Sequence, residues 1–246
     1  MQVQSMGIVD TTAKRILDRF DLRVLDERHA EGVPGRVLLD ENVILEIEQD
    51  GGLLEEVFCS EMDILGLYTP MSSPGIISLN LHNLSSFFWS LALGIYKKGY
   101  FMERQDFEKL SHMVVLKTYT HEQFHHFCNV CRYMFGGSFD KMKEEALAVA
   151  WSYLQVNVAK TAWASKEARL ASPLYYEMMK AMYQYKSPGY RDWKHFRSRD
   201  DLSAANTRYC GPTSSIKLEL NGIDIGVVLL KILDEVKDKG VVEILE

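Results

Sequence analysis

The chain has 246 residues, 47% of them hydrophobic and 25% charged, which is enough to bury a substantial core in one domain, or in one domain with a small appendage. The formal net charge of −6 and the pI near 5.7 argue against a protein that binds nucleic acid by neutralising phosphates. No apolar stretch approaches the ~20 residues needed to cross a bilayer, and no secretory signal is visible, so we expect no membrane partner and a cytoplasmic location. The four cysteines do not suggest a disulfide framework in a chain of this length.

The first third of the sequence predicts one short helix followed by strands. Residues 11–20 are amphipathic and begin at a threonine that can cap a helix. Apolar and alternating residues over 36–47, stopped by an Asp-Gly-Gly sequence, predict a β-hairpin, and residues 53–59 could add a strand. Residues 66–70 and 76–80 flank a Ser-Ser-Pro-Gly turn and predict two further extended segments.

The middle of the chain predicts helices. Asn83 is expected to cap a helix that ends at a Lys-Lys-Gly sequence. Residues 105–135 contain neither proline nor glycine and repeat apolar residues at helical spacing, so they predict one long helix or two abutting helices. A Gly-Gly-Ser sequence ends this segment, and a new helix is expected from Ser138 or Asp140. Two more helices are expected over 174–185 and after Ser187-Pro188, because proline favours the first helical turn.

The C-terminal residues differ in pattern from the helical region before them. Residues 216–220 predict a strand, 225–236 a helix and 241–245 a final strand. We therefore predict a main domain over residues 1–210 and a small strand-helix-strand extension over 211–246, packed on the same domain.

The most informative motif lies inside the long predicted helix. His121 and His125 are four residues apart, so on a helix both imidazoles lie on one side, with Glu122 next to the first. Two neutral nitrogen ligands and an adjacent carboxylate that can take a proton from water are what a zinc hydrolase requires. The pattern predicts Zn²⁺ as cofactor, His121 and His125 as ligands and Glu122 as the catalytic base.

A catalytic zinc site needs a third protein ligand. Glu144 and Glu145 lie 19 and 20 residues after His125, on the next predicted helix. The intervening Gly-Gly-Ser break lets that helix fold back beside the first. Both glutamates lie on partly apolar helix faces, so the residues alone leave the choice between them open.

These residues resemble the gluzincin branch of zinc metallopeptidases, in which a His-Glu-x-x-His motif is followed by a downstream glutamate. Within it, the sequence is most similar to regulatory peptidases of the ImmA/IrrE kind. The matching segments run roughly from residue 66 to residue 150: Gly66-Leu67-Tyr68, Ile77-Ser78-Leu79-Asn80 and Glu145-Ala146-Leu147-Ala148-Val149-Ala150. The resemblance favours Glu145 as the third metal ligand. Leu147 stands where this family usually has asparagine, and no helix-turn-helix segment is evident.

The resemblance implies an α+β, zincin-like fold that is mainly helical, with a small antiparallel sheet preceding the motif helix. It also implies a zinc-dependent peptidase acting on a protein or peptide substrate. In such folds an edge strand pairs with extended substrate, and residues 76–80 are the expected strand. Tyr153, His195 and Tyr209 are candidates for stabilising the oxyanion, and the sequence does not choose among them.

For the other histidine, cysteine and aromatic residues we expect structural roles. We expect His126 at the surface or behind the ligands rather than on the metal. Cys128 and Cys131 are expected as small core residues rather than as part of a second metal site completed by Cys59 and Cys210. A series of aromatic residues is expected to pack a helical face rather than line a substrate groove: Tyr175, Tyr176, Tyr183, Tyr185, Tyr190 and Trp193. The alternative functions are a catalytically silent binding or scaffolding protein with a zincin fold, and a helical interaction module without metal.

Overall fold

The structure is a computed structural model that describes residues 3–20, 37, 39–57, 65–69, 75–100, 102–135, 139–164, 173–210 and 241–245. Its helices are α1 (Val3–Leu17), α3 (Glu41–Val57), α4 (Leu81–Lys97), α5 (Arg104–Phe135), α6 (Lys141–Ala164), α7 (Pro173–Met182), the 3-10 helix η2 (Tyr190–Phe196) and α8 (Arg199–Cys210). Its strands are β1 (Gly66–Thr69), β2 (Ile76–Asn80) and β3 (Val241–Leu245). The chain is therefore mainly helical with a small sheet, as expected.

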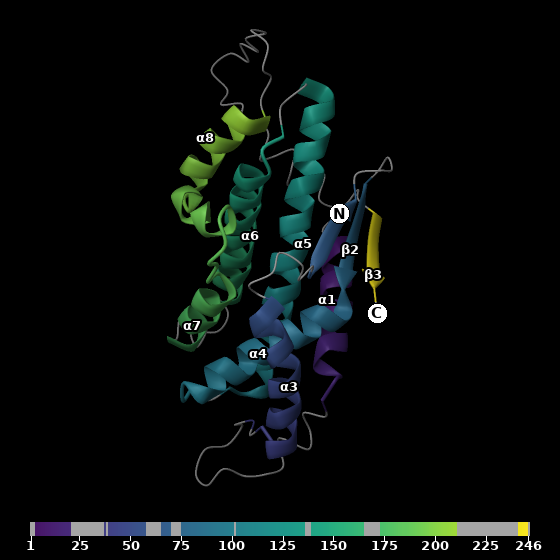
Figure 1. The fold of residues 1–246 in the computed structure, drawn as a ribbon, viewed down its shortest axis with the longest axis vertical. Helices are drawn as coiled ribbons and strands as arrows, with labels where there is room; N and C mark the ends of the chain where they lie inside the picture. The colour runs from purple at the N-terminus through teal and green to yellow at the C-terminus, as the bar shows by residue number, and fades with distance from the viewer. Residues whose placement is uncertain are drawn as a thin grey trace.

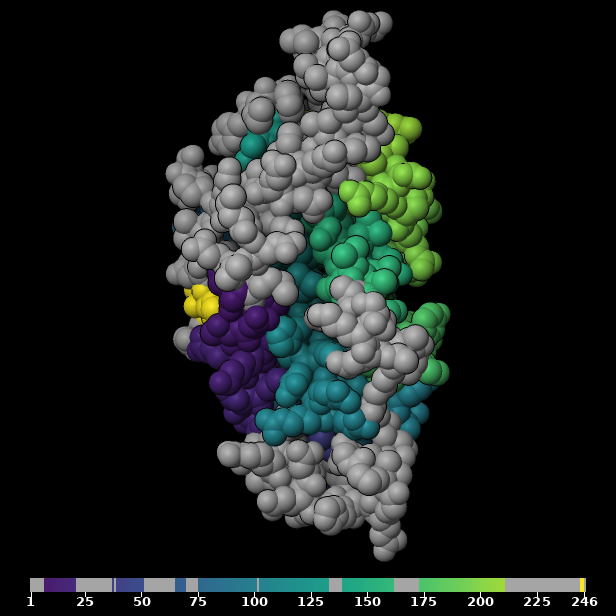
Figure 2. Space-filling view, turned by 180° about the vertical axis from the view of Figure 1, so that it is seen from behind, coloured from purple at the N-terminus to yellow at the C-terminus, as the bar shows by residue number. Residues whose placement is uncertain are grey.

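The long helix α5 runs through the middle of the molecule. The sheet lies on one side of α5, and α6, α7 and α8 lie on the other (Figure 1). Viewed from behind, α1 forms part of the surface beside α4 and α5 (Figure 2). At the start of α5, the side chain of Asp106 accepts a hydrogen bond from the backbone N–H of Glu103 at 2.8 Å, in the manner of a capping box. Residues 105–135 form one continuous helix rather than two.

The sheet is mixed rather than purely antiparallel. β1 and β2 pair antiparallel, with Tyr68 opposite Ile77, whereas β2 and β3 pair parallel, with Ile77 opposite Val242. The strand order is β1-β2-β3. The prediction that residues 76–80 form an edge strand is wrong, because the final strand of the chain pairs with their outer side. β1 is instead the edge strand that faces α5.

The hairpin predicted over residues 36–47 is also wrong, since residues 41–57 form helix α3. Asp40 accepts a hydrogen bond from the backbone N–H of Asn42 at 2.9 Å, which begins the helix. Arg19 contacts both Glu46 and Asp50, which share one helical face, and α3 packs on α4. Residues 53–57 belong to α3 rather than to a strand, and residues 58–59 lie outside the described part of the chain.

Several predicted boundaries move by a few residues. α1 begins at Val3, so Thr11 is not its cap and instead donates to the Gly7 carbonyl at 2.7 Å. Asn80, not Asn83, caps α4 by accepting from the backbone N–H of Asn83 at 2.9 Å. Asp140 precedes α6 and accepts from the Lys143 N–H at 3.2 Å.

The described helices from residue 173 onward also differ from their predicted bounds. The helix predicted over 174–185 ends at Met182, and the segment after Pro188 forms η2 and then α8. The predicted strand over 216–220 and helix over 225–236 lie outside the described residues. Residues 241–245 form β3 as predicted, and through β2 they join the sheet beside α5. None of the described helices is long and apolar enough to span a membrane.

Candidate metal centre

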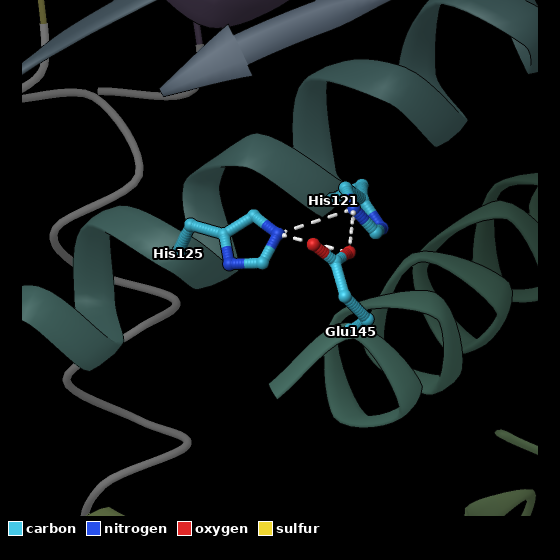
Figure 3. Close-up of side chains that lie close together, drawn as sticks. All are labelled: His121, His125 and Glu145. Atoms are coloured by element: carbon cyan, nitrogen blue, oxygen red, sulfur yellow. Dashed lines mark hydrogen bonds and ion pairs between the residues drawn. The ribbon is translucent and has the colours of Figure 1, made fainter. Parts of the chain in front are cut away.

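Helix α5 places His121 and His125 one turn apart, both directed toward α6 (Figure 3). The two Nε2 atoms lie 3.2 Å apart, and the rings meet edge to face with centroids 4.9 Å apart. Both side chains are largely shielded from solvent, with 13% and 16% exposed. The spacing of the motif on a regular helix therefore brings the two nitrogen atoms together, as the sequence predicted.

Glu145 on α6 completes the group. Its Oε2 lies 3.1 Å from His121 Nε2 and 3.4 Å from His125 Nε2 (Figure 3). Three donor atoms bound to one tetrahedral zinc ion at ~2.0–2.1 Å would be separated by about 3.4 Å from one another. The observed separations are close to that value, so these atoms form one triangular face of a potential tetrahedral site. Among the described residues, this is the group of histidine, cysteine and acidic side chains that could hold a metal ion.

Glu144 faces the opposite side of His125. Its Oε1 lies 2.9 Å from His125 Nδ1, while its other oxygen contacts Arg132 and accepts a hydrogen bond from the Tyr209 hydroxyl at 2.7 Å. A carboxylate can only accept, so Nδ1 of His125 carries a proton, and Nε2 is the atom that can offer a lone pair to a metal ion. A carboxylate behind a histidine ligand orients the ring and raises its basicity.

The charges of the group reflect the close approach of its donor atoms. Burial by itself lowers the pKa of His125, but its contacts with Glu144 and Glu145 raise the pKa to about 10. Burial opposes ionisation of Glu145, yet its hydrogen bonds with His121 and His125 hold the pKa of its carboxyl well below the usual range. Three electron-pair donors in contact require a positive charge between them, which a proton or a metal ion can supply. The donor set therefore fits a divalent cation.

Glu122 lies on the neighbouring face of α5, against strand β1. Its side chain is buried, and burial raises its pKa despite the nearby histidines and a hydrogen bond from the backbone N–H of Tyr68. The strand comes this close because residue 66 is glycine: a Cβ there would lie 2.8 Å from Thr118 Cγ2 and 2.9 Å from Glu122 Cγ. The candidate base is thus held between the motif helix and the edge strand.

Tyr190 lies at this centre, whereas its place in the aromatic series predicted that it would pack a helical face. Its ring stacks on His121, with centroids 6.0 Å apart and planes inclined by 12°. Burial and the nearby charge of Glu145 both raise the pKa of the Tyr190 hydroxyl. Gly189 allows this approach because it has φ = 83° and a Cβ would lie 3.1 Å from the Met142 carbonyl oxygen. No local pattern marks Tyr190, because it reaches the centre from a segment remote in sequence.

The oxyanion candidates named from the sequence lie elsewhere. Tyr153 packs between Tyr183 and Trp193, His195 is exposed on η2, and Tyr209 donates to Glu144 behind His125. The structure does not bring any of the three against the triad of His121, His125 and Glu145.

The remaining residues of interest lie around the centre rather than in it. His126 is buried with its Nδ1 3.2 Å from the Tyr68 hydroxyl, which places it behind the site and not at the surface. Cys128 and Cys131 are buried core residues as expected, and Cys128 Sγ lies 3.5 Å from Cys210 Sγ. Cys59 lies outside the described residues. Tyr175, Tyr183 and Trp193 pack in the core, whereas Tyr176 is 67% exposed.

Gly66→Ala is expected to destabilise the protein by about 1–3 kcal/mol, because the new methyl group overpacks the contact between β1 and α5. Gly94→Ala is the matched control. Gly94 is an exposed residue of α4 with open space around its Cβ position, so alanine should stabilise the helix by about 0.5–1 kcal/mol. Urea unfolding measures both changes. Equal effects of the two substitutions would contradict the close approach of β1.

No protein-family model matches this sequence, and no curated protein or solved structure shows significant similarity to the chain.

Proposed function

We propose that this protein is a zinc-dependent peptidase with a zincin-like fold of the gluzincin type. His121, His125 and Glu145 would hold the metal, and Glu122 would be the general base. The observation that carries the proposal is the convergence of two Nε2 atoms and one carboxylate oxygen within 3.4 Å of one another. An adjacent buried carboxylate completes the set of groups that metal-assisted hydrolysis needs.

Bound zinc would lower the pKa of a water molecule to about 7 and polarise the scissile carbonyl group. Glu122 accepts a proton from the attacking water on a carboxylate oxygen and passes it to the leaving amine. The buried position of Glu122 suits this role, because burial raises its pKa and makes the protonated form accessible. Glu144 holds the Nδ1 proton of His125, and the stacked ring of Tyr190 restrains the ring of His121.

The edge strand β1 supports a peptide as the substrate. It lies directly beside the motif helix, and Tyr68 within it meets Glu122 through its backbone N–H. An extended peptide can add to such an edge through main-chain hydrogen bonds, which would lay a peptide bond along the metal centre.

Zinc analysis tests the proposal. The purified protein is expected to bind one zinc ion per chain, and His121→Ala should remove it, because the two remaining ligands cannot complete a stable site. His112→Ala is the matched control on the same helix, since His112 contacts Asp10 far from the triad. Measurement is by elemental mass spectrometry after dialysis. Absence of zinc from the wild type, or equal zinc in both variants, would refute the proposal.

A further inference from the structure

Lys117 lies one helical turn before His121 on α5 and takes no part in metal binding or proton transfer at the triad. Its side chain is buried, with only 5% of the residue exposed. Three aromatic rings surround the ammonium: Nζ lies 4.5 Å from the centroid of Phe87, 5.8 Å from that of Tyr183 and 5.2 Å from that of Tyr185. A cation held in this way is uncommon, because lysine rarely gives up its hydration without a partner.

The aromatic rings compensate for only part of that lost hydration. Within the part of the chain that the structure describes, Lys117 forms no ion pair with a carboxylate. Burial alone lowers its pKa to about 7, with no neighbouring charge contributing. A buried ammonium in this state gains strongly from an anion that reaches it, because the surroundings screen the attraction weakly.

The cage around Lys117 continues directly to the metal centre. The ring of Tyr185 lies 5.5 Å from that of Tyr190, which in turn stacks on His121. Burial raises the pKa of Tyr185, and the charge of Glu145 raises it further, so Tyr185 lies within electrostatic reach of the triad. Lys117 and His121 are four residues apart and therefore share one face of α5, and the packed rings of Tyr185 and Tyr190 connect their surroundings.

We propose that Lys117 binds a carboxylate of the peptide substrate beside the metal centre. This inference rests on the proposed peptidase function and narrows its substrate class. Four helical residues separate the backbone positions of Lys117 and His121 by about 6 Å along the axis. Neighbouring residues of one extended peptide, ~3.4 Å apart, span a similar length. The carboxylate would belong to the residue that follows the scissile bond.

Two sources of this carboxylate share the same chemistry. If the residue is the last of the peptide, its C-terminal carboxylate reaches Lys117, and the protein is a carboxypeptidase. If the residue is internal, the side chain of aspartate or glutamate reaches Lys117, and the protein cleaves before acidic residues. A purely structural lysine would give no preference for either.

Peptide cleavage distinguishes these cases. A mixture of randomised hexapeptides is prepared once with free C-termini and once with C-terminal amides, and the products of the zinc-loaded protein are read by mass spectrometry. We expect removal of the last residue from the free acids only, or cleavage before aspartate and glutamate in both mixtures. Lys117→Met should reduce kcat/KM for these peptides about 10- to 100-fold, whereas Lys117→Arg should recover part of the selectivity. Cleavage that is indifferent to carboxylates, or selectivity that survives Lys117→Met, overturns the inference and leaves the peptidase proposal standing.

Binding provides a second measurement that does not need turnover. N-acetyl-L-alanine and N-acetyl-L-alaninamide are titrated into the zinc-loaded protein and into Lys117→Met, with NMR shifts as the readout. The acid should bind the wild type more tightly than the amide, and Lys117→Met should remove the difference. Such a result in a protein that cleaves nothing would support the inference and refute the peptidase. No binding of either probe, or equal binding of both, in a protein without hydrolysis would overturn it. Thermal melting and zinc content confirm that Lys117→Met is folded and loaded, since methionine fills a similar volume without a buried charge.

Discussion

Replacing Glu122 with glutamine is expected to lower kcat about 10²- to 10⁴-fold while leaving zinc bound, because a general base typically contributes that much to a rate. Glutamine has the volume of glutamate, and its amide oxygen can still accept from the backbone N–H of Tyr68. The ligand set of His121, His125 and Glu145 is untouched. The measurements are the cleavage rate of the free-acid hexapeptide mixture and the zinc content of the same sample.

The matched control for Glu122→Gln is Glu108→Gln. Glu108 is half exposed on the same helix, where it pairs with Arg104, so its replacement should change neither rate nor zinc content. Hydrolysis that persists in Glu122→Gln would show that another group accepts the proton. If the wild type hydrolyses no peptide and its cellular phenotype survives Glu122→Gln, a binding or scaffolding role replaces the enzymatic one.

Glu145→Gln is expected to abolish stoichiometric zinc binding, whereas Glu144→Gln should retain one zinc ion with an affinity lowered about 10- to 100-fold. The difference follows from geometry. The Oε2 atom of Glu145 faces the Nε2 atoms of both histidines, but Glu144 reaches only Nδ1 of His125 and thus acts behind the ligand. Competition with a chromophoric chelator measures both affinities at fixed pH.

The Glu144 and Glu145 variants serve as controls for each other, because the residues are adjacent on α6 and the substitution is the same. Glu144→Gln also weakens the contact with Arg132, so thermal stability is measured on the zinc-free proteins to separate folding from metal affinity. Loss of zinc from Glu144→Gln together with full retention by Glu145→Gln would reverse the assignment of the third ligand.

The sequence predicted the parts of the centre that depend on helical periodicity. A run without proline or glycine made α5 predictable, and four-residue spacing placed His121 and His125 on one side of it. A glutamate 20 residues later, beyond a glycine break, predicted that a second helix would return to the same place. The choice between Glu144 and Glu145 depends on how α6 is rotated about its own axis. Packing against α5 decides that rotation, and the local sequence pattern does not.

The prediction for residues 36–47 was wrong because their pattern is compatible with two periods. Val43, Ile44 and Ile47 fit one face of a helix as well as short alternating strands, and the glycine pair after them suggested a turn. Capping by Asp40 and packing on α4 favour the helix. Tertiary contacts therefore overrode the local signal for a hairpin.

The sequence by itself determined the chemical character of this protein: a helix carrying His121, Glu122 and His125, a following helix with two candidate carboxylates, and strands before and after. Only the tertiary structure decided which strand lies at the sheet edge, because β3 comes from the far end of the chain and pairs with β2. It also brought Tyr190 onto His121 and formed the aromatic cage around Lys117. These contacts join residues that are far apart in the chain. Such contacts produce no periodic pattern in a single sequence, so the sequence alone does not predict them.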